Sequence, residues 1–270
     1  MRMKIKDFAH TKEEFKLKRV EEGLYKTQNL PQNLDFYYDF EEYISHDESK
    51  KGIIGRVYDV VKKFMFYQKL NLIKKYSNEN PKVLDYGCGT GDFLDYLNQK
   101  KYKVEGFEPT QKANEIASKK DLKMHSDVNS IIGKFDVITL FHVLEHVEDI
   151  DYLIKRLKQK LNENGILIIA VPNHESKDAK IYKEFWAAWD VPRHIWHFSK
   201  SSLIRKIKSY SLKLISVKPL FFDAIYISMV SEKYKQGNSI KGILNGLYAN
   251  LSALKTKSWS SHIFIFKKGI

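Results

Sequence analysis

The chain has 270 residues, which fits one α/β domain of ordinary size with an extension. Its formal net charge is +13, but the lysines are spread along the whole chain, so charge alone predicts neither a nucleic-acid nor a membrane partner. The single cysteine, Cys88, excludes an internal disulfide and a cysteine-based zinc site, and we expect a cytoplasmic protein without a signal peptide or transmembrane segment.

Residues 1–80 are predicted to form an aromatic and helical N-terminal extension that caps the core. Segment 36–46 is dense in aromatic side chains and tyrosine hydroxyls. Two interpretations stay open for it, a clasp that closes the core and a wall of a ligand pocket. An apolar stripe at helical spacing then predicts a helix over 55–76 that packs on the edge of the domain.

From Lys82 onward, short apolar runs alternate with helical patterns, which predicts a parallel sheet with helices on both faces. Run 263–266 is apolar on both faces, so the last strand is expected to be interior. The expected strands are 83–86, 103–107, 123–124, 135–140, 166–171, 212–217 and 261–267. The expected helices between them are 92–100, 110–120, 150–161 and 199–209.

Two stretches interrupt this alternation and are predicted to be insertions in a domain of residues 81–270. Residues 173–198 hold three tryptophans around Pro-Arg-His, in which Arg193 is expected to pair with a core carboxylate or with an acidic ligand. Residues 219–260 predict two amphipathic helices. A lid, a dimer face and a membrane-surface element are all compatible with that pattern.

Strand 83–86 runs directly into Gly-Cys-Gly-Thr-Gly at 87–91, just before a predicted helix. Glycine admits positive φ and has no Cβ, so this turn is predicted to bring backbone N–H groups against a nucleotide-like ligand. A dinucleotide-binding motif needs a third glycine where this chain has Asp92, and a P-loop needs Gly-Lys-Ser/Thr. Both are excluded, and Cys88 is interpreted as a small residue of the turn rather than a nucleophile.

With Asp85 before it, the turn resembles motif I of the class I S-adenosylmethionine-dependent methyltransferases. The resemblance implies a doubly wound, seven-stranded, mostly parallel Rossmann-like sheet with its last strand antiparallel, and S-adenosylmethionine as cofactor. It places Asp85 at the cofactor's ammonium, Glu108 at both ribose hydroxyls and Asp127 at the adenine amino group. The cofactor-binding residues it implies are Asp85, Tyr86, Gly87, Cys88, Gly89, Gly91, Glu108, Asp127 and Phe141.

After strand 135–140, His142, Glu145 and His146 stand at i, i+3 and i+4 and project from one face of a helical turn. The segment is similar to the Glu-x-x-Glu-His of the ubiquinone O-methyltransferase and small-RNA 2′-O-methyltransferase families, which bind a divalent metal there. Because His142 replaces the first glutamate, we expect no metal and a general base at His142 or His146. Alternatively, Glu145 and His146 only tie down the loop.

The Pro-Arg-His and His-Phe-Ser elements resemble the methyltransferase-domain 23 subgroup, and the resemblance covers residues 82–209. Motifs of DNA amine and pyrimidine C5 methylation are absent after strand 135–140, so no DNA partner is expected. The expected acceptor is a small molecule or a glycan- or lipid-pathway intermediate methylated at oxygen. An RNA methyltransferase and a non-catalytic cofactor-binding regulator are the alternatives, and a homodimer and a peripheral membrane contact stay open.

Overall fold

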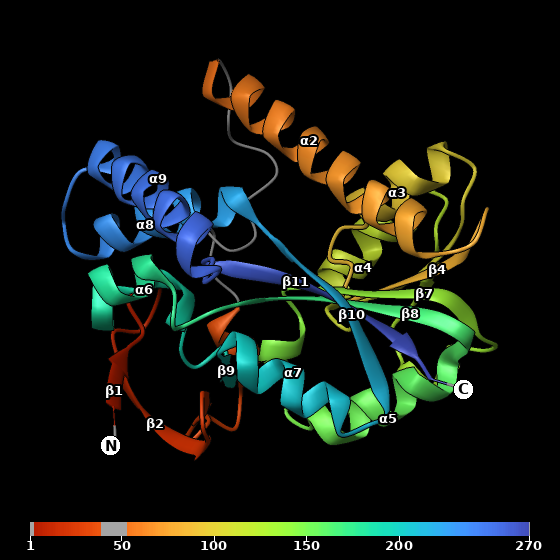
Figure 1. Ribbon diagram of the computed structural model, residues 1–270, viewed down its shortest axis with the longest axis horizontal. Coiled ribbons are helices and arrows are strands. Elements are labelled where there is room, and N and C mark those ends of the chain that lie inside the picture. The colour runs from red at the N-terminus through yellow and green to blue at the C-terminus, as the bar shows by residue number, and fades with distance from the viewer. Residues whose placement is uncertain (1–2, 39–52, 270) are drawn as a thin grey trace.

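A computed structural model describes residues 3–38 and 53–269 (Figure 1). Its centre is a seven-stranded sheet in the order β10-β11-β8-β7-β4-β5-β6. Neighbours from β8 to β6 are parallel, and β11 is antiparallel to both β8 and β10. The strands are β4 (Lys82–Tyr86), β5 (Lys103–Phe107), β6 (Lys123–His125), β7 (Phe135–Phe141), β8 (Leu161–Pro172), β10 (Leu212–Pro219) and β11 (Ser261–Lys268). The predicted doubly wound architecture is confirmed.

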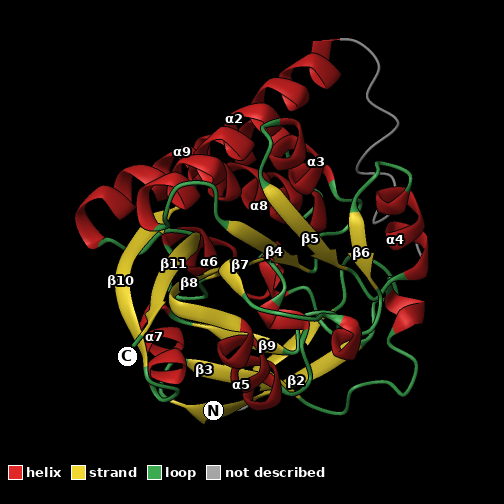
Figure 2. Cartoon of the chain, turned by 90° about the vertical axis from the view of Figure 1, so that its right-hand side faces the viewer, coloured by secondary structure: helices red, strands yellow, loops and turns green. Residues whose placement is uncertain are grey.

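Helices cover both faces of this sheet, as Figure 2 shows. One apolar cluster joins the sheet to α2 and α3, and a second joins its opposite face to α5 and α7. Strand β11 is buried between β8 and β10 because its Ile-Phe-Ile-Phe run is apolar on both faces, as predicted. The helices are α2 (Ile53–Tyr76), α3 (Asp92–Gln99), α4 (Gln111–Ser118), α5 (Ile150–Lys160) and α7 (Lys200–Lys208).

The N-terminal extension begins with strands that the sequence analysis did not predict. Strands β1 (Met3–Lys6), β2 (Glu14–Glu21) and β3 (Leu24–Thr27) form a small antiparallel sheet with β9 (Trp196–Phe198). Alternate residues of the first half of β2, such as Phe15 and Leu17, are buried. Because β9 belongs to insertion 173–198, the extension and this insertion are joined by one hydrogen-bonded sheet.

The insertions are helical. Insertion 173–198 contains the short helix α6 (Lys177–Tyr182), and insertion 219–260 contains α8 (Phe221–Tyr234) and α9 (Ser239–Thr256), which confirms the two predicted helices. Of the aromatic segment 36–46, only Phe36, Tyr37 and Tyr38 lie within the described residues. Among the described helices, none is long and apolar enough to cross a membrane.

Arg193 ties the extension to the insertion through a buried charge cluster. Its guanidinium donates to Asp7 at 2.9 Å, to Asp190 at 2.7 Å and to the carbonyl of Tyr37 at 3.1 Å. Of the two partners predicted for Arg193, a core carboxylate and an acidic ligand, the structure shows core carboxylates. Burial alone would raise the pKa values of Asp7 and Asp190, but the adjacent guanidinium holds both below the ordinary value of 3.8.

Replacing Arg193 should destabilise the fold strongly. The Arg193→Leu variant leaves two buried carboxylates without their cation, so we expect a loss of about 3–5 kcal/mol in the free energy of unfolding, measured by urea denaturation at pH 7. Because Asp7 and Asp190 have depressed pKa values when folded, the loss should be full above about pH 5 and shrink as the pH falls below 3.8. Arg19→Leu, on an exposed strand position, is the matched control. Equal stability of the two variants would contradict this role.

Candidate functional site

The glycine turn between β4 and α3 is packed on two sides and open on one. The φ angles of Gly87, Gly89 and Gly91 are 75°, 56° and 77°, the left-handed region that favours glycine. A Cβ added at Gly87 would lie 2.5 Å from the Val143 side chain, and one at Gly91 would lie 2.9 Å from Leu122. Nothing lies within 4 Å of a Cβ at Gly89, so the space over this residue can admit a ligand.

The backbone N–H groups of the turn are used within the protein. Those of Gly87 and Cys88 donate to the carbonyl of Phe107 at 2.7 and 3.1 Å, and that of Gly89 donates to Glu108 Oε2 at 2.9 Å. The N–H of Gly91 donates to the carbonyl of Cys88 at 3.0 Å. The prediction that the glycine N–H groups face the ligand is therefore wrong for Gly87, Gly89 and Gly91. What these glycines provide is the path of the backbone and, at Gly89, free space.

Asp85 is a buried carboxylate at the end of β4. Its Oδ1 accepts a hydrogen bond from the Thr139 hydroxyl at 2.6 Å, and burial raises its pKa. Lys69 of α2, which the sequence analysis missed, interacts electrostatically with Asp85, and its Nζ lies 3.9 Å from the centroid of the Phe141 ring. Burial lowers the pKa of Lys69. Asp85 and the ring of Phe141 thus already surround one cation.

Glu108 follows β5 and is held by two backbone groups. Its Oε2 accepts from Gly89 and its Oε1 accepts from the Thr110 N–H at 2.9 Å. A carboxylate has about four acceptor positions, so Glu108 still has capacity for a pair of hydroxyl groups. Asp127, after β6, is exposed, and its Oδ1 accepts from the N–H of Asn129 at 2.9 Å. Its Oδ2 is the oxygen that remains for a ligand.

Tyr86 and Cys88 serve the site by packing. The Tyr86 ring stacks on Phe107 with centroids 4.2 Å apart, and burial raises its pKa to about 12. Burial also raises the pKa of the Cys88 thiol, which therefore stays protonated. Neither side chain offers a charged group at neutral pH.

His142 stands at the end of β7 between two carboxylates. Its Nδ1 lies 3.3 Å from Glu145 Oε1, and its Nε2 lies 3.0 Å from Oδ2 of Asp223 in α8. Burial opposes the charged form, but Asp223 and Glu145 raise the pKa of His142 to about 10. The imidazole is therefore protonated at neutral pH, and a role of His142 as general base does not fit this arrangement. The ion pair instead connects β7 to α8.

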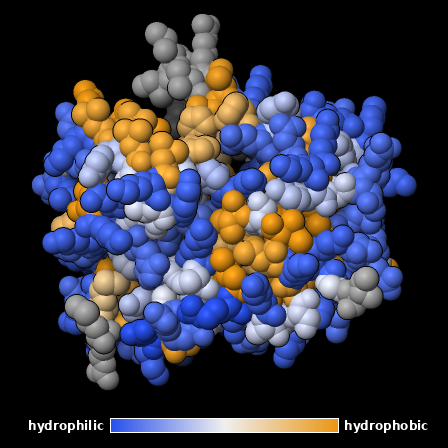
Figure 3. Space-filling model, in the orientation of Figure 1, coloured by the Kyte–Doolittle hydropathy of each residue, from blue (hydrophilic) through white to orange (hydrophobic). Residues whose placement is uncertain are grey.

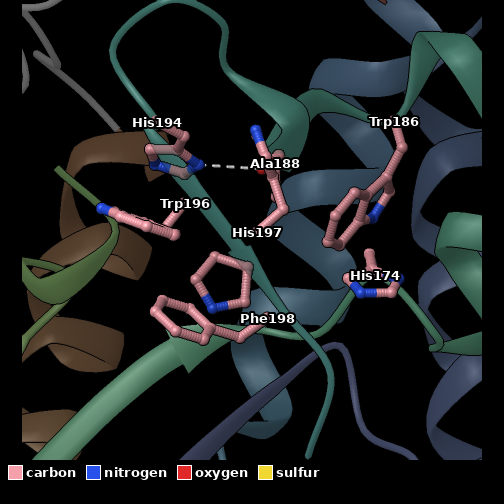
Figure 4. A pocket seen from close by; sticks show the side chains of 8 residues that line it. His174, Trp186, Ala188, His194, Trp196, His197 and Phe198 are labelled. Atoms are coloured by element: carbon pink, nitrogen blue, oxygen red, sulfur yellow. Dashed lines mark hydrogen bonds between the residues drawn. The ribbon is translucent and has the colours of Figure 1, made fainter. Parts of the chain in front are cut away.

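His146 and His194 face each other with rings 4.7 Å apart. The Nδ1–H of His146 donates to the carbonyl of Arg193 at 3.0 Å, with the Tyr38 hydroxyl also 3.0 Å from this nitrogen. The Nδ1–H of His194 donates to the carbonyl of Ala188 at 2.9 Å (Figure 4). In each ring Nδ1 is taken by a carbonyl, so Nε2 is the atom left to bind a proton or a metal ion. Burial and the neighbouring His194 lower the pKa of His146 to about 4, so it is neutral.

Glu145 completes this group and changes the expectation about metal. It is 1% exposed, and among the described residues neither carboxylate oxygen accepts a hydrogen bond of normal geometry. Its ligand atom and those of His146 and His194 all lie within 4.8 Å of one another. One carboxylate and two imidazoles, each imidazole held through its other nitrogen by a carbonyl, suit a divalent ion such as Zn²⁺. We predicted no metal, and His194 is the group that the prediction lacked.

The aromatic loop around His194 is a packed support and not an open pocket. Figure 4 shows the side chains around a cavity of about 10 Å³, room for about one water molecule. Trp186 and Trp189 are buried and pack with residues of the N-terminal strands. The rings of Trp186 and Trp189 therefore belong to the core and do not line an open ligand pocket.

The model of a family described as "Methyltransferase domain" matches residues 61–217, more than half of the chain. The chain belongs to this methyltransferase family. Its seven-stranded sheet, the space over Gly89 and the acids Asp85 and Glu108 fit the cofactor of such enzymes. The protein is therefore an S-adenosylmethionine-dependent methyltransferase.

Named relatives and solved structures agree with this assignment. The methyltransferase is 33% identical to "Ubiquinone biosynthesis O-methyltransferase" of Pelagibacter ubique over 181 residues. This match covers 59% of this chain and 75% of the relative. The protein of the same name from Rickettsia typhi is 25% identical over 221 residues, 74% of this chain and 86% of the relative. Phosphoethanolamine N-methyltransferase 2 of Haemonchus contortus, solved with S-adenosyl-L-methionine, shares the fold with a TM-score of 0.52 and 16% identity, over 76% of this chain and 53% of that chain.

Filling the space over Gly89 should block the cofactor. We expect Gly89→Val to weaken binding of S-adenosylhomocysteine at least about tenfold, or 1.4 kcal/mol, in calorimetry. Gly133→Val is the matched control, because Gly133 also has positive φ and meets only Lys82 Nζ, at 3.8 Å. Unchanged affinity of a folded Gly89→Val variant would show that the cofactor does not approach this turn.

The three-ligand group should bind a divalent cation. After treatment with a chelator, the wild type should take up one Zn²⁺ per chain in calorimetry, whereas Glu145→Gln should weaken that binding at least about tenfold because the anionic ligand is lost. Glu175→Gln, at an exposed position, should leave it unchanged. Equal zinc binding by the wild type and Glu145→Gln, or none by the wild type, would contradict a metal site at these three residues.

Proposed function

We propose that this methyltransferase moves the cofactor's methyl group to a hydroxyl oxygen of a small molecule or of a glycan- or lipid-pathway intermediate in the cytoplasm. The observation that carries the proposal is the grouping of Glu145 and His146, just after β7, with His194 of insertion 173–198. The same loop after β7 contacts the cofactor turn, since the Val143 side chain packs against Gly87. The names of the relatives support methylation at oxygen. The identity of the acceptor is left open to experiment.

The proposed cofactor position follows from the charges at the strand ends. The buried carboxylate of Asp85 would attract the ammonium of the methionine part, in the region that Lys69 now occupies with its own ammonium. Glu108 would accept from the ribose hydroxyls, and the remaining oxygen of Asp127 would accept from the adenine amino group. Phe141 would then present its ring to the positively charged sulfonium.

The reaction is a direct displacement at the methyl carbon. The acceptor oxygen forms the new C–O bond while the C–S bond breaks and its electron pair stays on sulfur, which leaves S-adenosylhomocysteine. The hydroxyl proton must leave, and we assign its acceptance to Nε2 of His146, because this imidazole is neutral and its lone pair is available. Alignment of the reactants supplies most of the acceleration in such a reaction.

Further side chains around the site position the acceptor hydroxyl and His146. Charged His142 holds Glu145 on one side and Asp223 of α8 on the other, so it fixes the insertion against the end of β7. A divalent ion held by Glu145, His146 and His194 would use the Nε2 lone pair of His146, so the ion and the His146 base are alternative ways to activate the hydroxyl. The ion would polarise the acceptor oxygen and lower the pKa of its hydroxyl. The Tyr38 hydroxyl lies 3.0 Å from Nδ1 of His146, so Tyr38, the last described residue of the aromatic segment, would form part of the wall of the acceptor pocket.

A labelled-methyl assay tests the function directly. Purified enzyme, a cell-extract metabolite pool and isotope-labelled S-adenosylmethionine should yield a labelled small molecule whose fragment masses show a methoxy group. His146→Asn should lower turnover about 10²-fold or more while the affinity for S-adenosylhomocysteine stays unchanged, and His10→Asn should leave both unchanged. Label in RNA alone, or wild-type turnover by His146→Asn, would contradict the proposal.

A further inference from the structure

Helix α9 turns its large apolar side chains toward solvent. Their exposed fractions lie between 37% and 65%, and they follow one another at helical spacing along one side. We call this set the α9 apolar face. It consists of Ile240, Ile243, Leu244, Leu247, Tyr248, Leu251 and Leu254. Figure 3 shows hydrophobic atoms gathered over the α8 and α9 region at the upper left.

The inward side of α9 is made of small residues, the reverse of an ordinary surface helix. Gly242, Gly246, Ala249 and Ala253 are the buried positions of the helix. A Cβ added at Gly242 would lie 2.6 Å from the backbone of α8, and one at Gly246 would lie 2.5 Å from it. The two helices therefore touch backbone to backbone, and the large side chains stay exposed, with Lys177 of α6 lying 5.4 Å from the centroid of the Tyr248 ring. A continuous apolar surface of this kind usually has a partner.

The charges around the α9 apolar face indicate which partner fits. Residues 239–257 contain no aspartate or glutamate, and Lys241, Lys255 and Lys257 are exposed. Lys241 also lies 3.7 Å from the buried Glu232, which offsets part of its charge. The chain as a whole carries +13, so two copies pressed together on this face would bring like charges together. A surface with negative charge is attracted instead.

We propose that the α9 apolar face docks on the surface of a lipid bilayer with anionic headgroups. The leucines and isoleucines would enter the boundary between headgroups and acyl chains, and the lysines would lie among the phosphates. Asn250 donates to the carbonyl of Phe221 at 2.8 Å, which fixes α9 to the start of α8, close to Asp223 of the site. Docking would therefore place the acceptor side of the enzyme near the bilayer.

Vesicle co-sedimentation with the full chain tests this inference. The wild type should sediment with phosphatidylcholine vesicles that contain phosphatidylglycerol, and at least about tenfold less with phosphatidylcholine alone or in high salt. The double variant Leu244→Glu/Leu251→Glu should bind at least about tenfold more weakly. The matched control is Val20→Glu/Ile132→Glu, which changes two apolar side chains that are 52% and 77% exposed elsewhere, and it should bind like the wild type.

Two further readouts decide between occupants of the face. Both double variants should keep the wild-type circular dichroism and the affinity for S-adenosylhomocysteine, so loss of vesicle binding is not loss of the fold or of the cofactor site. Sedimentation velocity should show a monomer for the wild type. A wild-type dimer that Leu244→Glu/Leu251→Glu dissociates would assign the face to a second copy and overturn the proposal. Vesicle binding that the double variant leaves unchanged would also overturn it.

Discussion

A single buried guanidinium, that of Arg193, sets the geometry on which the acceptor side of the enzyme depends. It neutralises Asp7 of the N-terminal extension and Asp190 of the insertion, two carboxylates that would be costly to bury alone. The same residue accepts the Nδ1–H of His146 on its carbonyl, and its neighbour is His194. The charge cluster therefore fixes both imidazoles, and the extension contributes to the site through it.

The proposed cofactor and acceptor sides meet at the end of β7, and each has its own electrostatic character. On the cofactor side, Asp85 is held by Thr139 and lies close to the ammonium of Lys69, so this place already favours a positive group. On the proposed acceptor side, Glu145 is charged and buried beside the neutral imidazole of His146 and the ring of His194. The first arrangement suits the ammonium and sulfonium of S-adenosylmethionine. The second suits a proton or a divalent cation.

The sheet and the cofactor acids could be predicted because their signals are local: apolar runs, a glycine turn, and an acid after each strand. Strands β1 to β3 could not, since β2 is mostly charged and the sheet that holds it is completed by the pairing of β3 with distant β9. His194 lies near Glu145 only because insertion 173–198 folds back against the loop after β7. The charge on His142 depends on Asp223 of α8, far along the chain. Long-range contacts of this kind leave no periodic pattern.

The most direct test of the central claim is a crystal structure of the complex with S-adenosylhomocysteine. We predict ribose hydroxyls on Glu108, the amino-acid end at Asp85, and the sulfur directed past Phe141 toward the space in front of Glu145, His146 and His194. A ligand whose sulfur faces away from those three side chains, or one bound elsewhere than over Gly89, would contradict it.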